Sequence, residues 1–259
     1  MSENKKKKVY FDYNVFVNYI NSSEVKSEVE KKQDTYIYVS SPAFLEEVAN
    51  IKGGEELITT YITKISELYN NTILIPTVDA GIILKEEHPQ QCYNRVMKDY
   101  IWTKIASKLS HRFLAQKPQF KNIREEFGIS TIEINNIAPE NLFNDYRIKD
   151  FIEKNPRLTN ISFFEGDKSV EWLDVNEDFH LIQEKISNSF DVLEVLGFYP
   201  EKENMYSSRM HDVTHAIYGT QADFLVTCDN RFLKKCKAVY HFLGVPTKVI
   251  SYEEFKKNY

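Results

Sequence analysis

Two aspartates in this 259-residue chain each follow a short apolar segment, and that placement suits them for chemistry. Asp12 closes the segment Val9–Asp12, and Asp229 lies two residues after Phe224–Thr227. Both segments are typical of buried strands, and side chains just beyond the carboxyl ends of parallel strands meet at one edge of a sheet. Mg²⁺ and Mn²⁺ prefer oxygen ligands such as carboxylates. The placement therefore favours a divalent-metal site assembled from residues far apart in the sequence.

A carboxylate cluster of this kind suits the hydrolysis of phosphodiesters. That reaction needs neutralised phosphate oxygens, an activated water and a stabilised leaving oxygen. Two divalent ions about 3.5–4 Å apart can supply all three. A nuclease that uses such ions needs no nucleophilic side chain, because the attacking group is water.

Two histidines offer a different metal chemistry. His211 and His215 are four residues apart and would share one face of a helix, as in the zinc-binding motif H-E-x-x-H. Here the intervening acid is Asp212, which is shorter than Glu, and no clear third ligand follows. A zinc hydrolase would also leave Asp12 without a role. The zinc site is therefore the second interpretation of this segment, behind a carboxylate-bound Mg²⁺ or Mn²⁺.

Strands and helices alternate at both ends of the chain, and this alternation must position the acids. The predicted strands are Val9–Asp12, Tyr36–Val39, Thr72–Ile75, Phe224–Thr227 and Lys248–Ile250. The predicted helices are Asn14–Ile20, a helix that begins at Ser41-Pro42 and stops at Gly53-Gly54, Glu55–Leu68, Met210–Gly219, Asn230–Lys237 and a terminal helix capped by Ser251. The pattern predicts an α/β fold with a central parallel sheet flanked by helices.

The middle of the chain has a different character. From about residue 80 to residue 195 the pattern is mainly helical and is interrupted by four prolines: Pro89, Pro118, Pro139 and Pro156. We therefore expect one domain over residues 1–259, with core segments at about 9–80 and 200–259. The helical stretch between them is expected to be a large insertion.

Four segments resemble the PIN-domain family, in the family's order. They are Val9-Tyr10-Phe11-Asp12-Tyr13-Asn14, Ser41-Pro42-Ala43-Phe44-Leu45-Glu46-Glu47-Val48, His211-Asp212-Val213-Thr214-His215-Ala216 and Ala222-Asp223-Phe224-Leu225-Val226-Thr227-Cys228-Asp229. The segment Gly244–Ser251 also resembles the last strand of that family. The resemblance covers roughly residues 9–50 and 205–255. It implies a metal-dependent nuclease, most often a ribonuclease, that binds Mg²⁺ or Mn²⁺ through Asp12, Glu47, Asp212 and Asp229.

Two features depart from the family pattern. The stretch between Glu47 and Asp212 is far longer than a compact PIN domain requires. Glu46 is adjacent to Glu47, and neighbours on a helix point about 100° apart, so only one of them can face the site. Glu47 is favoured because it lies six residues after Ser41 and precedes the apolar Val48.

Three further residues are expected to support the acids. Asn14 can orient Asp12 or contact metal-bound water, although capping the following helix is an equal alternative. The resemblance implies that Thr227 hydrogen-bonds a carboxylate of the site. His215 lies three residues after Asp212, near the same helix face, and a contact with phosphate is weighed against a packed histidine.

A basic stretch is the candidate substrate-binding surface. Lys104, Lys108 and Arg112 follow the spacing i, i+4, i+8 and would form one stripe on a helix. Such a stripe would add salt-dependent affinity for phosphates, while a solvated helix face is the alternative. Nucleic acid is the expected partner, RNA ahead of DNA. Lys234, Lys235 and Lys237 could border the site beyond Asp229.

Composition limits the remaining choices. The net charge of −5 excludes an evenly basic surface, so any polyanion would be met locally. The three cysteines lack the spacing of a disulfide framework or a zinc ribbon. No apolar run is long enough for a membrane span. These features predict a cytoplasmic protein without a membrane partner, and a homo-oligomer or a protein regulator is compatible. A PIN-like module that binds RNA or protein without cutting is the alternative to an enzyme.

Overall fold

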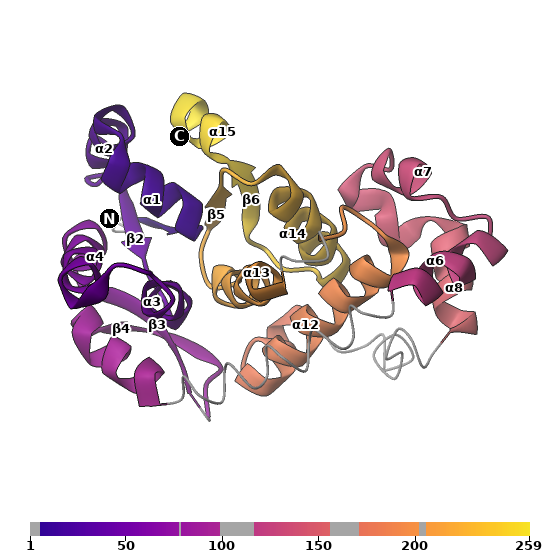
Figure 1. The fold of residues 1–259 in the computed structure, drawn as a ribbon, viewed down its shortest axis with the longest axis horizontal. Coiled ribbons are helices and arrows are strands. Elements are labelled where there is room, and N and C mark those ends of the chain that lie inside the picture. The colour runs from indigo at the N-terminus through magenta and orange to yellow at the C-terminus, as the bar shows by residue number, and fades with distance from the viewer. Residues whose placement is uncertain (1–5, 78, 99–116, 156–170, 202–205) are drawn as a thin grey trace, which may run out of the picture.

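A sheet of four parallel strands lies at the centre of the molecule, in the order β2-β1-β5-β6 (Figure 1). The computed structural model describes residues 6–77, 79–98, 117–155, 171–201 and 206–259. The strands of this sheet are β1 (Lys7–Phe11), β2 (Tyr36–Val39), β5 (Phe224–Thr227) and β6 (Lys248–Ser251). Every residue of β5 is buried, as expected for a parallel strand covered on both faces. The predicted α/β class with a central parallel sheet is confirmed.

A second, antiparallel sheet stands beside the first. It consists of β3 (Thr72–Pro76) and β4 (Ile82–Glu86), and a single parallel bridge from Ser40 to Ile73 connects it to the end of β2. The prediction of helix from about residue 80 is therefore wrong over Ile82–Glu86. Gly81 adopts a φ of +64°, and its carbonyl accepts the amide of Thr77, which closes a hairpin. Most of β4 is exposed, so the strand lacks the apolar alternation that would have identified it.

Several helices begin directly after a strand, and polar residues at the junctions cap them. They are α1 (Tyr13–Asn21), α3 (Pro42–Ala49), α14 (Asn230–Leu243) and α15 (Tyr252–Asn258), capped by Asp12, Ser41, Asp229 and Ser251. The helices α2 (Ser23–Glu30) and α4 (Gly54–Tyr69) complete this part of the fold. The predicted helix Asn230–Lys237 is too short, since α14 ends only where Gly244 takes a φ of +71°. Glycine is favoured at such a helix end because it lacks a Cβ.

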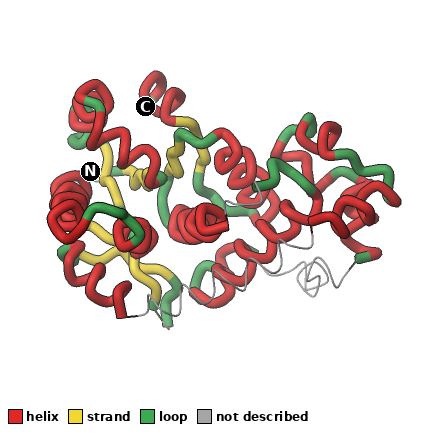
Figure 2. Tube along the Cα trace, in the orientation of Figure 1, coloured by secondary structure: helices red, strands yellow, loops and turns green. Residues whose placement is uncertain are grey.

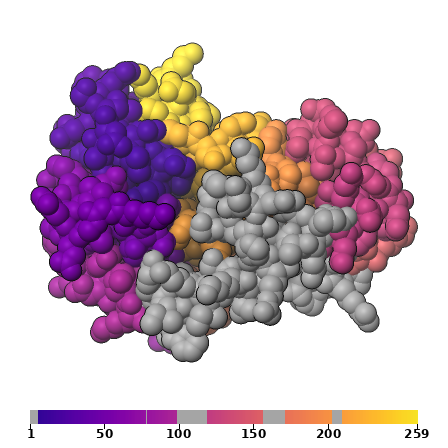
Figure 3. Space-filling view, viewed as in Figure 1, coloured from indigo at the N-terminus to yellow at the C-terminus, as the bar shows by residue number. Residues whose placement is uncertain are grey.

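The segment between β4 and α13 is mostly helical where it is described. Residues 89–98 are helical, and α6 (Lys117–Glu126), α7 (Thr131–Asn135), the 3₁₀ helix η1 (Pro139–Asn144) and α8 (Tyr146–Lys154) form a lobe at the right of Figures 1 and 3. Figure 2 shows no strand in this lobe. Phe143 of η1 stacks on Phe242 of α14 with ring centroids 4.4 Å apart. Apolar packing therefore holds the lobe against α14.

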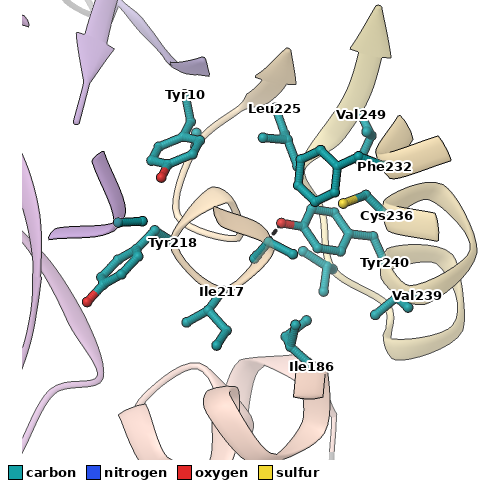
Figure 4. Packing of buried hydrophobic residues seen from close by; sticks show 14 of the residues in the cluster. Tyr10, Ile186, Ile217, Tyr218, Leu225, Phe232, Cys236, Val239, Tyr240 and Val249 are labelled. Atoms are coloured by element: carbon teal, nitrogen blue, oxygen red, sulfur yellow. Dashed lines mark hydrogen bonds between the residues drawn. The ribbon is translucent and has the colours of Figure 1, made fainter. Parts of the chain in front are cut away.

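Three helices connect the lobe to the sheet: α11 (Trp172–Val175), α12 (Phe179–Leu196) and α13 (Tyr206–Gly219). Figure 4 shows Ile186 of α12 and Ile217 of α13 facing the cluster that contains Leu225 and Tyr240. The hydroxyl of Tyr240 donates a hydrogen bond to the carbonyl oxygen of Ala216. Across the described segments, none of the helices combines the length and apolarity that crossing a lipid bilayer demands.

A buried ion cluster joins α12 to α14. The Lys235 ammonium, which is 1% exposed, donates to Glu194 Oε1 at 2.8 Å and to Glu201 Oε1 at 2.6 Å. Lys235 therefore does not border the site as a free cation. Removing one partner of a buried ion pair leaves the other charge without compensation, which is strongly destabilising.

We expect Lys235→Ala to lower the free energy of unfolding by about 3–5 kcal/mol, because Glu194 and Glu201 lose their buried cation. Chemical denaturation measures the effect. Lys234→Ala on the same helix is the control and should change stability by less than about 0.5 kcal/mol. Equal denaturation midpoints for the two variants would contradict the structural role of the cluster.

Candidate active site

The pairing of β1 with β5 brings the two strand-end aspartates together. Phe11 is in register with Val226, and the amide of Asp12 donates to the carbonyl oxygen of Val226 at 2.8 Å. The hydroxyl of Thr227 donates to Asp12 Oδ2 at 2.8 Å and accepts the amide of Asp229 at 2.9 Å. Thr227 therefore connects the two acids, and the hydrogen bond expected for it is present.

Asp12 is almost completely buried and is held by local donors. The amide of Tyr13 donates to its Oδ1 at 2.7 Å, and the Asn14 side chain donates to its Oδ2 at 3.2 Å. Burial raises the pKa of Asp12, and the charge of Glu47 adds to this rise, whereas His215 and Thr227 lower it. The first of these effects is desolvation, which penalises the charged carboxylate.

Asp229 caps α14 as well as facing the site. Its Oδ1 accepts the amides of Arg231 at 2.6 Å and Phe232 at 3.1 Å. The capping interpretation and the ligand interpretation are compatible, because these capping bonds use one carboxylate oxygen. Asp12 likewise caps α1 through its Oδ1.

Glu47 and Glu46 have different surroundings, as their neighbouring positions on α3 require. Glu47 Oε1 lies 2.9 Å from His215 Nε2, and its charge acts on Asp12. Glu46 instead lines a pocket beside the hairpin. Burial raises the pKa of Glu46 to about 7. The structure thus directs Glu47, and not Glu46, toward Asp12.

A chain of buried hydrogen bonds supports Glu47 from behind. The hydroxyl of Tyr10 lies 2.7 Å from Ser41 Oγ and 2.6 Å from His215 Nδ1, while His215 Nε2 faces Glu47. A consistent set of donors runs from Ser41 to Tyr10 to Nδ1, and from Nε2–H to the carboxylate of Glu47. His215 is 0% exposed, so a phosphate cannot reach its ring. Of the two alternatives for this residue, the structure shows the packed histidine.

The sequence did not predict this series of hydrogen bonds. Tyr10 looks like a core residue of an apolar strand, and Ser41 looks like a helix cap, which it also is. Only the packing of β1 against α3 and α13 shows that the Tyr10 hydroxyl contacts both Ser41 and His215. No local signal in the sequence identifies such a contact.

Asp212 lies on α13 within electrostatic range of the other acids. Burial raises its pKa well above the usual value, and the charges of Asp12, Glu201 and Asp229 add to the rise, while Lys235 opposes it. The charge of Asp212 thus interacts with those of Asp12 and Asp229, and the charge of Asp12 interacts with that of Glu47. Like charges in a poorly solvated place repel one another, and a divalent cation would relieve that repulsion.

The two histidines do not form a shared site. Both ring nitrogens of His215 are engaged, by Tyr10 and by Glu47. His211 Nε2 lies 3.4 Å from Asn50 Nδ2, and burial lowers the pKa of His211. Zinc bound by this pair would require His215 to give up one of these two contacts.

No group of three or more His, Cys, Asp or Glu side chains in the described part of the chain is already spaced to hold one metal ion. The local partners explain this spacing. Asp12 is held by Thr227, Glu47 by His215, and Asp229 by the first turn of α14. A shared cation would have to draw these side chains inward.

The predicted basic stripe of Lys104, Lys108 and Arg112 lies outside the described residues. Lys234 and Lys237, on α14 beyond Asp229, are partly buried. Comparison of the chain with protein-family models, with curated proteins and with solved structures yields no significant match. The function must therefore be inferred from the residues and their geometry.

We expect Asp212→Asn to raise stability at neutral pH when no divalent ion is added. The raised pKa means that folding favours the protonated form, so the fold loses stability as pH rises from about 4 through the folded pKa. Asparagine removes this loss. The denaturation midpoint of the variant should exceed that of wild type at pH 7, and the gain should shrink toward pH 4.

The exposed Asp174 provides the control, because Asp174→Asn should shift the midpoint little at either pH. A lower midpoint for Asp212→Asn at pH 7 would show that its carboxylate is stabilised in the fold rather than strained.

We expect Tyr10→Phe to cost about 1–3 kcal/mol of stability, because it leaves His215 Nδ1 and Ser41 Oγ buried without their shared partner. Tyr19→Phe is the matched control, since Tyr19 is also buried and its hydroxyl makes one longer contact of 3.3 Å with Glu30. Thermal or chemical denaturation compares the two. An equal loss in both variants would argue against the hydrogen-bond chain.

Proposed function

We propose that this protein is a PIN-like, divalent-metal-dependent nuclease that hydrolyses RNA internally. The supporting observation is the gathering of Asp12, Asp212 and Asp229, with Glu47 acting on Asp12, at one edge of a parallel sheet. These acids come from four separate segments, and their proximity strains the fold electrostatically. Helix capping accounts for Asp12 and Asp229 individually, whereas cation binding would account for the proximity of all four acids.

The donor set fits a hard divalent cation such as Mg²⁺ or Mn²⁺. All four candidate ligands are carboxylates, and Mg²⁺ takes one or two carboxylates together with waters and phosphate oxygens. Asp12 and Asp229 would hold the main ion, with Glu47 and Asp212 completing the site. When bound, such ions neutralise phosphate oxygens and lower the pKa of water.

The surrounding residues keep the acids ready for this role. Thr227 and Asn14 donate to Asp12 Oδ2, which favours its ionised form and fixes its orientation. His215 Nε2 contacts Glu47 and fixes its orientation, and Tyr10 in turn orients His215. Burial and the charges of Asp12, Glu201 and Asp229 raise the pKa of Asp212, so Asp212 is the acid proposed to accept a proton.

The helical segment between the two core parts would be an insertion that helps to shape the substrate path. In this proposal the chain is one domain with core segments at about 9–80 and 200–259. The stripe of Lys104, Lys108 and Arg112 would bind phosphates of the strand. A cytoplasmic location and a protein regulator or second copy as a further partner belong to the same proposal.

We expect wild type to cut mixed-sequence single-stranded RNA when Mg²⁺ or Mn²⁺ is added, and Asp12→Asn to lower the rate at least about a hundredfold. Thr227→Val should weaken activation by the metal about 10–100-fold, because Thr227 orients Asp12 without touching the ion. Asp223→Asn is the control, since Asp223 is exposed at the opposite end of β5. Gel analysis of end-labelled RNA over a metal titration measures all three.

Equal cleavage by wild type and Asp12→Asn would refute the proposal. RNA binding without metal-dependent cleavage would instead favour the non-catalytic module. The local satisfaction of Asp12, Glu47 and Asp229 is the observation that keeps that second function in view. Zinc in the purified protein that disappears in His215→Ala would favour the zinc hydrolase.

A further inference from the structure

A cavity with both apolar and polar walls lies against α3, where Glu46 lines it. It has a volume of about 450 Å³, within the range of roughly 300–1,000 Å³ that is usual for small-molecule sites. Its walls come from α3, the β3–β4 hairpin, the helix at residues 89–98 and α13. The lining residues that matter here are Glu46, Ile75, Lys85, Arg95, Val96 and Tyr218.

Glu46 is the polar group that has no assigned role in the proposed reaction. Its side chain lines this cavity, and no donor among the described residues hydrogen-bonds to its carboxylate; Asn50 contacts only its backbone carbonyl. A largely buried carboxylate without a donor carries a free-energy cost that a ligand with N–H groups would remove. Glu47, its neighbour, already has His215.

The other walls favour a flat ring. Ile75 and Val96 are apolar, and Tyr218, which also lines the cavity, is almost completely buried. Figure 4 shows Tyr218 directed away from Ile217 and Tyr240, toward the N-terminal part of the chain. Aromatic and apolar surfaces of this kind stack on the bases of single strands.

The two cations of the cavity differ in availability. Arg95 is fixed by two hydrogen bonds to the buried Glu87, so its charge is compensated. Lys85 has a half-exposed side chain, and its ammonium lies 3.9 Å from Glu87 Oε1. Lys85 is therefore the cation that can reach out to a phosphate at the rim.

We infer that this cavity binds a guanine base of the substrate strand, with Glu46 as the residue that selects it. Guanine has two adjacent N–H donors on its pairing edge, N1–H and the N2 amino group, which match the two oxygens of one carboxylate. Adenine, cytosine and uracil each place an acceptor beside their donor on that edge, and an acceptor repels a carboxylate. Lys85 would contact the phosphate of the same nucleotide.

The inference rests on the proposed nuclease function for its link to cleavage. Glu46 is adjacent to Glu47 on α3, and Tyr218 lies one turn after His215 on α13. The same two helices thus present the cavity and the acids. A guanine held by Glu46 would place a neighbouring phosphodiester close to the acidic cluster.

Binding of mononucleotides to the full chain tests the cavity without requiring cleavage. We expect guanosine 5′-monophosphate to bind about tenfold more tightly than the adenosine, cytidine and uridine monophosphates, and Glu46→Gln to abolish that preference. Glu56→Gln, at an exposed position of α4, is the control for loss of a carboxylate. Equal binding of the four nucleotides by wild type overturns the inference.

Cleavage of a randomised RNA pool tests the link to the strand. Wild type should cut with guanine enriched at one fixed position, and Glu46→Gln should lose about tenfold of that enrichment. A pool cut without base preference, or with a preference that Glu46→Gln retains, overturns the inference while the nuclease stands. Guanosine monophosphate binding that depends on Glu46, in a protein that cuts no RNA with either metal, refutes the nuclease and leaves a guanine site.

Discussion

The pairing of β1 with β5 is the constraint on which the rest of the site depends. Asp12 becomes a neighbour of Thr227 and Asp229 only because the register sets Phe11 opposite Val226. A shift of one residue would turn every side chain of β1 to the opposite face. The buried residues on both strands oppose such a shift, since it would exchange side chains between two packed faces and disrupt the packing on each. The register that packs the core is thus the same register that places Asp12 beside Thr227 and Asp229.

Hydrogen bonds and one buried cation reduce the free-energy cost of placing these carboxylates near one another. Asp12 has three local donors, Glu47 has His215, and Lys235 offsets part of the field at Asp212. These contacts lower the cost of each negative charge, but the charges still raise one another's pKa values. These contacts therefore hold the acids in place. They leave part of the repulsion between the carboxylates uncompensated, and the proposed cation would offset it.

Sequence patterns predicted the parts of the fold in which local and global preferences agree. The strands at Tyr36–Val39 and Phe224–Thr227 have the predicted bounds because each is a buried apolar run beside a capping residue. The hairpin strand Ile82–Glu86 was missed, since its exposed residues follow no alternation and pairing with β3 creates it. Tertiary pairing overrides local pattern in such strands.

The same division holds for the site. Asp12 and Asp229 could be predicted from the sequence because each follows a short apolar segment that is typical of a buried strand. The different environments of Glu46 and Glu47 depend on the packing of α3 against α13, which no spacing rule describes. Tyr10 could not be distinguished from a core tyrosine, because its hydrogen bonds to Ser41 and His215 join residues separated by 31 and 205 positions.

The pairing of β1 with β5 also bears on the synthesis of the chain. Ribosomes synthesise a protein from its amino end, so Asp12 and Glu47 emerge before residues 224–229 have been made. Until then β1 has no β5 beside it, and the carboxylates remain scattered. The acidic cluster therefore cannot form on the growing chain before β5 has left the ribosome and paired with β1.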